Sequence, residues 1–163
     1  MSEMRFFDRQ LACYASYHKH ARNRATHFIG IPMIVFALLY LAAWVHLPGG
    51  ISLALVIGVA ALALWIALDA ALGLAMAVVM VPLWLAGEFL AQRYSGGLWG
   101  WGLFGVLFVG GWVFQLVGHV YEGRRPALVD NLFQALVGPM FLMAEIFAAL
   151  GWRKEPGHPA PSN

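Results

Sequence analysis

The sequence predicts an all-α protein: a polytopic membrane helix bundle with about five transmembrane helices, preceded by an N-terminal interfacial helix. One reason is composition, because 61% of the 163 residues are hydrophobic and 11% are charged, whereas about a quarter of an ordinary soluble domain is charged. The other is the absence of Asp, Glu, Lys and Arg between Arg24 and Asp69. That stretch is long enough for two crossings of about 20 residues each.

Turn signals and three further apolar runs complete the expected bundle. Pro48, Gly49 and Gly50 predict the turn between the first two crossings, and a tight turn near Asp69 separates the second crossing from the third. We therefore expect five spanning helices in all. The last three cover residues 70–91, 98–118 and 132–150.

The chain is expected to form a single membrane-embedded helical domain, residues 1–152, followed by a tail. The tail, 153–163, is rich in proline and polar residues and is predicted to be disordered, so His158 is assigned no role. The first 27 residues contain several charges and no apolar core, which argues against a cleavable secretory signal. The basic residues form no continuous stripe, so we expect no nucleic acid partner.

The distribution of Lys and Arg predicts the orientation in the membrane. With a cytoplasmic N-terminus, seven basic residues lie on the cytoplasmic side and three on the far side, as the positive-inside rule favours. We expect a bacterial inner membrane, or the endoplasmic reticulum in a eukaryote. The seven are Arg5, Arg9, Lys19, Arg22, Arg24, Arg124 and Arg125, and the three are Arg93, Arg153 and Lys154.

Four of the six histidines fall in two polar clusters, residues 14–27 and 115–122, and almost everything between them is apolar. Four crossings separate the clusters, so both return to the same face of the membrane. Imidazole and carboxylate groups suit iron or zinc, so the pattern predicts a metal site at the membrane surface. His119 and Glu122 are three residues apart and share one helix face. The alternative is that Glu122 pairs with a neighbouring arginine and His119 is an ordinary interfacial residue.

The first cluster requires a break in the helix. His18 and His27 are nine residues apart, about 900° of rotation, which places them on opposite faces of one continuous helix. His20, Asn23 and His27 do share a face, so the periodicity alone favours His20 over His18. An N-cap at Asn23 would start a new helix and allow His18 to fold back toward His27. The alternative is that the basic residues of this cluster bind lipid head groups and the histidines bind nothing.

Together the two clusters resemble a known membrane family, the iron-dependent 2-hydroxy fatty acid dioxygenases of fatty acid α-oxidation. The resemblance implies that His18, His27 and His119 bind Fe(II), with Glu122 as a candidate fourth ligand. His20 stands where relatives often have Asn, so it is a candidate only for a position outside the coordination sphere. Ala21 stands where many relatives have Pro. The motifs are Tyr14-x3-His18-x4-Asn23-x3-His27-x2-Gly30-x-Pro32 and Gln115-x2-Gly118-His119-x2-Glu122-x3-Pro126-Ala127.

The resemblance also implies a reaction, in which a 2-hydroxy fatty acid and O₂ give a fatty acid one carbon shorter. A 2-hydroxy acid can chelate iron through its carboxylate and hydroxyl groups, and an ion with three protein ligands then keeps a position for O₂. Four protein ligands would leave too few positions. Two ligand sets therefore stay open: the three histidines with Glu122 outside the coordination sphere, or a set in which Glu122 replaces one histidine.

Further residues of the two clusters are candidates for supporting roles. Tyr14, Asn23 and Gln115 are the catalytic candidates, and Tyr14 and Gln115 would donate hydrogen bonds to bound oxygen or to the ligand imidazoles. Arg124 and Arg125 are positioned to bind the substrate carboxylate, although a positive-inside anchor explains them equally well. The membrane would then hold the acyl chain among the helices.

Three other functions compete with this one. A two-iron histidine-box enzyme would need about eight clustered histidines by analogy with that family, and a haem protein would need paired histidines near mid-membrane. A non-enzymatic scaffold or small transporter would bind lipid head groups or no metal. Outside the clusters, Glu88 and Glu145 are expected to lie away from the site and to snorkel or form a helix-to-helix hydrogen bond, and His46 is assigned no role.

Overall fold

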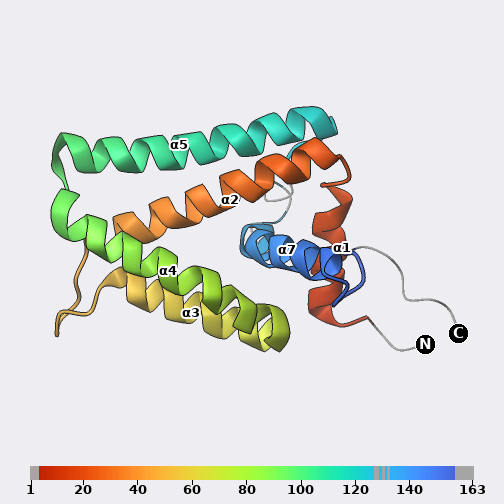
Figure 1. Ribbon diagram of the computed structural model, residues 1–163, viewed down its shortest axis with the longest axis horizontal. Helices are drawn as coiled ribbons and strands as arrows, with labels where there is room; N and C mark the ends of the chain where they lie inside the picture. Colours follow the sequence, from red (N-terminus) through yellow and green to blue (C-terminus); the bar gives the residue numbers. More distant parts are fainter. Residues whose placement is uncertain (1–3, 127–128, 130, 132, 157–163) are drawn as a thin grey trace, which may run out of the picture.

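The computed structural model describes residues 4–126, 129, 131 and 133–156, and it confirms the all-α prediction (Figure 1). The predicted tail lies largely outside these residues. Every regular element in the described part of the chain is a helix. The helices are α1 (Phe6–Ser16), α2 (Ala21–Ala42), α3 (Leu53–Leu68), α4 (Ala70–Tyr94), α5 (Gly97–Glu122) and α7 (Phe133–Ala149).

Among the described helices, α2, α4 and α5 are long and apolar enough to cross a membrane. They have 22, 25 and 26 residues, whereas α3 and α7 are shorter apolar helices of 16 and 17 residues. The expected count of five spanning helices is therefore not confirmed. Both predicted turns are present: Gly49 and Gly50 have positive φ values between α2 and α3, and Asp69 is the residue between α3 and α4.

Helices α2 and α5 lie side by side, as Figure 1 shows, and glycine allows the close approach. A Cβ atom added at Gly30 would lie 2.7 Å from the Gly111 carbonyl oxygen, and one added at Gly111 would lie 2.9 Å from the Gly30 carbonyl oxygen. Any side chain at either position would push the two backbones apart. Helices α3 and α4 form the second pair.

Helix α7 packs against α1, α2 and α4 in the half of the molecule that also holds α1 (Figure 1). The ring centroid of Phe133, the first residue of α7, lies 5.6 Å from that of Phe6. Just beyond the last turn of α7, the Arg153 guanidinium lies 3.3 Å from the Asp8 carboxylate. Nine of its 17 residues are buried, whereas 22–28% of the residues are buried in the best windows of the three spanning helices. Because both ends of α7 lie near α1, this helix does not carry the chain to the opposite end of the bundle.

The position of α7 corrects two predictions about sidedness. Arg153 was expected on the far side, but its guanidinium lies 2.8 Å from Asp69, at the same end of the bundle as α1. Glu145 was expected away from the two polar clusters, but its carboxylate lies 3.5 Å from Arg24 at the start of α2. Both errors have one cause, because an apolar run of this length suits a buried helix as well as a crossing.

Asp69 is the centre of an ion-pair network that joins the ends of several helices. Its carboxylate accepts a hydrogen bond from the Arg153 guanidinium and another from the backbone N–H of Leu72 at the start of α4. It also lies 3.5 Å from the Arg5 guanidinium. Burial alone would raise the pKa of the Asp69 carboxyl, but the hydrogen bonds from Arg153 and Leu72 and the nearby positive charges hold it below its ordinary value. The network fixes the α3–α4 turn against α1 and the segment after α7.

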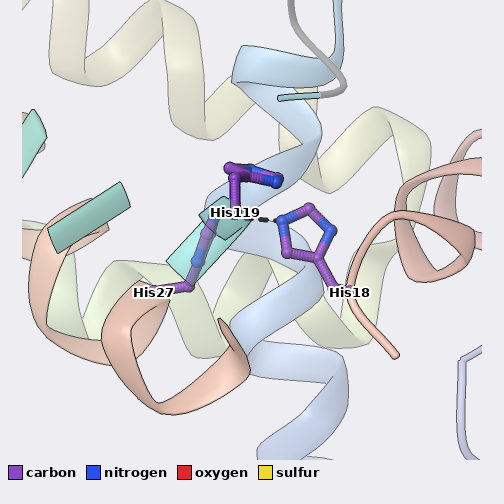
Figure 2. Close-up of side chains that lie close together, drawn as sticks. All are labelled: His18, His27 and His119. Carbon is purple, nitrogen blue, oxygen red and sulfur yellow. Dashed lines mark hydrogen bonds between the residues drawn. The ribbon is translucent and has the colours of Figure 1, made fainter. Parts of the chain in front are cut away.

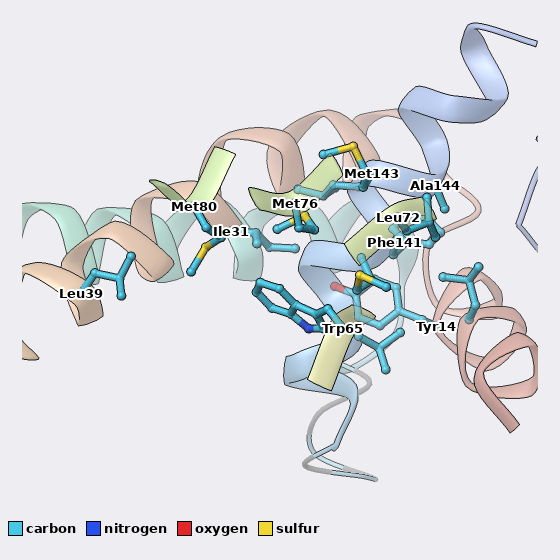
Figure 3. Close-up of a cluster of buried hydrophobic side chains, with 14 of the residues drawn as sticks. Tyr14, Ile31, Leu39, Trp65, Leu72, Met76, Met80, Phe141, Met143 and Ala144 are labelled. Atoms are coloured by element: carbon cyan, nitrogen blue, oxygen red, sulfur yellow. The ribbon is translucent and has the colours of Figure 1, made fainter. Parts of the chain in front are cut away.

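The buried core lies between α2, α4 and α7, with side chains also from α1 and α3 (Figure 3). Leu72 and Met76 of α4 contribute to it together with Phe141 of α7 and Ile31 of α2. Elsewhere, Glu88 of α4 accepts hydrogen bonds from Ser52 at the start of α3 and from the Trp84 indole, 2.8 Å away. Of the two outcomes expected for Glu88, snorkelling or a helix-to-helix hydrogen bond, the structure shows the hydrogen bond.

Candidate metal centre

Three buried histidines meet at one end of the bundle (Figure 2). His18 lies in the link between α1 and α2, His27 lies in the second turn of α2, and His119 lies in the last turn of α5. One ring nitrogen from each lies within 4.8 Å of the other two. The fold therefore brings together the three residues that the resemblance singled out.

Backbone carbonyl groups fix the orientation of two of these rings. His18 Nδ1 lies 2.7 Å from the Tyr14 carbonyl oxygen, and His27 Nδ1 lies 2.8 Å from the Asn23 carbonyl oxygen. A carbonyl oxygen can only accept a hydrogen bond, so the network assigns the proton of each neutral ring to Nδ1. Each Nε2 atom then presents a lone pair, and the two Nε2 atoms lie 3.0 Å apart.

This arrangement fits a metal cation. Two lone pairs at 3.0 Å repel each other unless a positive charge lies between them. The same separation is expected for two neighbouring ligands of an octahedral ion whose bonds are about 2.1 Å long, a typical metal-to-imidazole distance. His119 adds a further sign, because its Nδ1 atom is buried and has no hydrogen-bond partner among the described residues.

Burial also keeps His18 in the form that binds metals. Removal from water lowers the pKa of the His18 imidazole to about 4, and the hydrogen bond to the Tyr14 carbonyl oxygen opposes only part of this effect. The ring is therefore neutral at physiological pH. A neutral imidazole has a lone pair available for an ion without first losing a proton.

The helix break that admits His18 occurs three residues earlier than predicted. The N-cap of α2 is His20, whose Nδ1 atom accepts the Arg22 N–H at 3.1 Å, so the prediction of an N-cap at Asn23 was wrong. Asn23 lies inside α2, where its side-chain amide donates to the Tyr17 carbonyl oxygen and to Glu122. The break leaves His20 exposed and His18 buried, so His18 is the member of this pair that joins the cluster.

Glu122 binds the link between α1 and α2. Its carboxylate accepts the backbone N–H groups of Lys19 at 3.0 Å and His20 at 2.8 Å, and the Asn23 amide at 3.1 Å. These N–H groups lie at the start of a helix, where donors have no partner within the helix. Glu122 does not belong to the group of ligand atoms within 4.8 Å of one another. Its observed contacts therefore hold the segment that carries His18.

Aromatic rings enclose His18 on its other side. The Tyr14 ring stacks on the imidazole with centroids 4.1 Å apart and planes 3° from parallel, and Phe141 of α7 lies 5.5 Å from the same imidazole. Burial raises the pKa of the Tyr14 phenol, which stays protonated. The contribution of α7 was not predicted from the sequence. Its available signal was Gln134, a buried polar residue at the start of an apolar run, whose amide donates to Gln10.

The arginine that follows α5 has a structural contact. Arg124 donates a hydrogen bond to the Ser16 carbonyl oxygen, 3.1 Å away, and its guanidinium lies 5.4 Å from the Tyr17 ring. It thereby satisfies a carbonyl group at the end of α1. Arg125 is exposed and precedes Pro126, which lines the cavity described next.

A cavity of about 790 Å³ extends from the three histidines between the helices. Gln115 and His119 of α5 line it, together with Tyr14 of α1. Its other lining residues are mostly aliphatic and come chiefly from α2, α3 and α7, as far as Val45 and Leu53. The polar groups are concentrated at the histidine end, so the space suits a molecule with a polar head and a long apolar tail.

Sequence comparisons agree with this geometry. Residues 4–150 match the family described as Mpo1-like, 2-hydroxy-palmitic acid dioxygenase Mpo1-like. The chain belongs to this family. It is 37% identical over 150 residues to the 2-hydroxy-palmitic acid dioxygenase MPO1 of Saccharomyces cerevisiae, an alignment that covers 88% of this chain and 80% of the yeast protein. No solved structure matches the chain. The resemblance inferred from the two polar clusters is thus confirmed.

Proposed function

We propose that this protein is an Fe(II)-dependent dioxygenase that converts a 2-hydroxy fatty acid into a fatty acid one carbon shorter. The yeast relative named as a 2-hydroxy-palmitic acid dioxygenase supports the substrate class and the enzyme class. The observation that carries the proposal is the pair of Nε2 atoms of His18 and His27, 3.0 Å apart beside His119 at the polar end of a long apolar cavity.

His18, His27 and His119 would hold the ion, and Glu122 would hold the link that carries His18. A bound Fe(II) would supply adjacent positions for a chelating substrate and for O₂. The remaining roles, which are to bind and orient the substrate, belong to side chains of the protein. Tyr14 and Gln115 line the histidine end of the cavity and would donate hydrogen bonds to the substrate head group. Arg125, next to the lining residue Pro126, remains a candidate for the carboxylate.

The reaction needs no separate reductant. One 2-hydroxy acid and one O₂ balance with one shortened fatty acid, one CO₂ and one water. The bond between the carboxyl carbon and the hydroxyl-bearing carbon breaks, and that second carbon becomes the new carboxyl group. All the electrons that reduce O₂ therefore come from the substrate.

The charge distribution supports a cytoplasmic location for the N-terminus and the metal site. With Arg153 now placed at the histidine end, the described arginine at the opposite end is Arg93, in the last turn of α4. This asymmetry is stronger than the one expected from the sequence, and the positive-inside rule assigns the basic end to the cytoplasm. A substrate whose tail lies in the membrane would then present its head group at the cytoplasmic surface.

The test is metal analysis of the purified protein and four variants. His18→Ala, His27→Ala and His119→Ala each remove one proposed ligand. His20→Asn is the matched control, because His20 lies in the same cluster, is exposed, and is replaced by a residue that also caps helices. We expect about one iron per chain in the wild type and the control, and loss of iron in the other three variants.

Activity completes the test. Each protein is loaded with Fe(II) and incubated in air with 2-hydroxypalmitic acid, and the products are separated by mass spectrometry. The wild type and His20→Asn should form the acid one carbon shorter, and the three alanine variants should not. A wild type that binds no iron and stays inert after loading would refute the proposal and would favour the lipid-binding scaffold.

A further inference from the structure

The cavity has a defined direction, which bears on how much of the substrate it can hold. Its histidine end is bounded by His27 on α2, and its lining on the same helix continues to Ala42, the last residue of α2, and then to Val45 in the loop that follows. His27 and Ala42 are 15 positions apart, which corresponds to about 22 Å at 1.5 Å per residue. The cavity is thus elongated, and it runs beside α2 into the apolar part of the bundle.

Two stripes of side chains form the long walls. On α3 the lining residues are Leu53, Ile57, Ala61 and Trp65, which are four positions apart and share one face. Ala61 is the smallest residue of this stripe. Trp65 is fixed by a hydrogen bond from its indole to the Leu136 carbonyl oxygen of α7. The α2 stripe opposite includes Ile31, Val35, Leu38 and Ala42, and Val45 extends it into the loop after α2.

The loop between α2 and α3 sets the register of the two walls. The Leu53 N–H donates to the Val45 carbonyl oxygen at 2.8 Å, so the two helices run antiparallel from this pair. Val45 lies three residues beyond the end of α2, so counting back eight residues from it and forward eight along α3 places Ala61 roughly level with Ala37. Ala61 therefore lies about 15 Å from the level of His27, and Ala42 lies about 22 Å from it.

Extended acyl chains can be placed on this scale. A fully extended chain advances about 1.2 Å per bond, so an eight-carbon chain spans about 8 Å, a sixteen-carbon chain about 18 Å and a twenty-two-carbon chain about 25 Å. With its head group at the histidines, the shortest chain ends before Ala61 and the sixteen-carbon chain passes it. The longest chain also passes Ala42.

We propose that this cavity measures the acyl chain, with Ala61 providing the space through which long chains pass and Ala42 marking a second limit closer to the end. The proposal rests on the proposed function and adds the residues that determine chain-length specificity. The occupant is the tail of a 2-hydroxy fatty acid, because the polar lining is concentrated beside the metal centre and the length of the cavity matches that of a long acyl chain.

The test compares Ala61→Phe with Ala63→Phe. Ala63 is on the same helix, is exposed, and does not line the cavity, so the same change is made on the opposite side of the wall. Binding is measured by displacement of a fluorescent fatty acid with 2-hydroxyoctanoic, 2-hydroxypalmitic and 2-hydroxybehenic acids. Turnover and iron content are measured in parallel.

We expect Ala61→Phe to weaken binding and turnover of the two longer acids by about tenfold or more and to leave 2-hydroxyoctanoic acid unchanged, because the ring overlaps only chains that pass it. Ala42→Phe should weaken binding and turnover of 2-hydroxybehenic acid alone, and Ala63→Phe should leave all three acids unaffected. Ala61→Leu makes the same comparison if the phenylalanine prevents folding.

Two results would overturn the measuring role. One is equal binding and turnover of all three acids by the Ala61 and Ala63 variants, and the other is an Ala61→Phe variant that retains its iron but binds none of the three acids. Failure of the proposed function looks different. In that case the wild type turns over none of the acids, whatever their length.

Discussion

Replacement of Gly118 by alanine tests whether the contact between α2 and α5 sets the geometry of the metal centre. Gly118 precedes His119, and a Cβ atom there would lie 2.5 Å from Asn23 Oδ1 and closer still to Thr26 Oγ1. Neither atom can easily move away, because Thr26 donates to the Asn23 carbonyl oxygen and the Asn23 amide holds Glu122. The Asn23 contact alone requires the two helices to separate locally by about 0.5 Å to restore a contact of about 3 Å, and the closer Thr26 contact requires more.

This displacement should affect function more than stability. Overpacking costs about 1–3 kcal/mol, and the better helix propensity of alanine offsets about 1 kcal/mol, so the net loss is at most about 2 kcal/mol. A shift of more than half an ångström in a ligand that must meet two others is expected to lower turnover by about tenfold or more, since a misplacement of 1 Å can cost about a hundredfold.

Gly105→Ala is the matched control on the same helix, because a Cβ atom at Gly105 meets nothing within 4 Å. It should gain up to about 1 kcal/mol and keep full activity. The assay is thermal unfolding in detergent together with iron content and turnover of 2-hydroxypalmitic acid. If Gly118→Ala retains the iron and the activity of Gly105→Ala, the close helix contact does not position His119 and the reasoning fails.

Two further predictions concern the surroundings of the site. Glu122→Gln should weaken iron affinity by about 10- to 100-fold without abolishing binding, because an amide holds the N–H groups of Lys19 and His20 less well than a carboxylate. Competition with a chelator measures this affinity. Complete loss of iron would instead make Glu122 a ligand. Asp69 has a pKa below its unfolded value, so the unfolded chain binds more protons between the two values and stability falls as the pH drops below about 4. Asp69→Asn should flatten this dependence in thermal unfolding between about pH 3 and pH 6, and an unchanged slope would show that the carboxylate contributes no such stability.

The sequence predicted the elements whose signals are local. The charge-free stretch after Arg24 and the turns at Gly49 and Asp69 are features of neighbouring residues, and the structure contains the corresponding helices and turns. Helix geometry showed that His18 and His27 can meet only if the helix between them is broken, and the resemblance supplied the reason to expect both at one site. The location of the break did not follow from the sequence, because His20 and Asn23 are both able to cap a helix, and the choice depends on Glu122, which arrives from α5.

Features that depend on packing between distant segments were not predictable in this way. His119 and Glu122 share a helix face, yet one joins the histidine cluster and the other binds the link between α1 and α2. The apolar run of α7 has nearly the length of a crossing, and its burial against α1 and α4 is visible only in the fold. Phe141 and Gln134 therefore escaped the sequence analysis although both lie beside the site.

The three histidines are far apart along the chain, and this separation has a consequence for biosynthesis. His18 and His27 are made and inserted first, whereas His119 and the α7 residue Phe141 emerge only with the last third of the chain. Two imidazoles alone hold an ion weakly, so a partly synthesised chain has no complete centre. With the proposed function, oxygen chemistry would thereby be delayed until the helices that enclose the site are in the membrane, which would protect both the growing chain and the surrounding lipids.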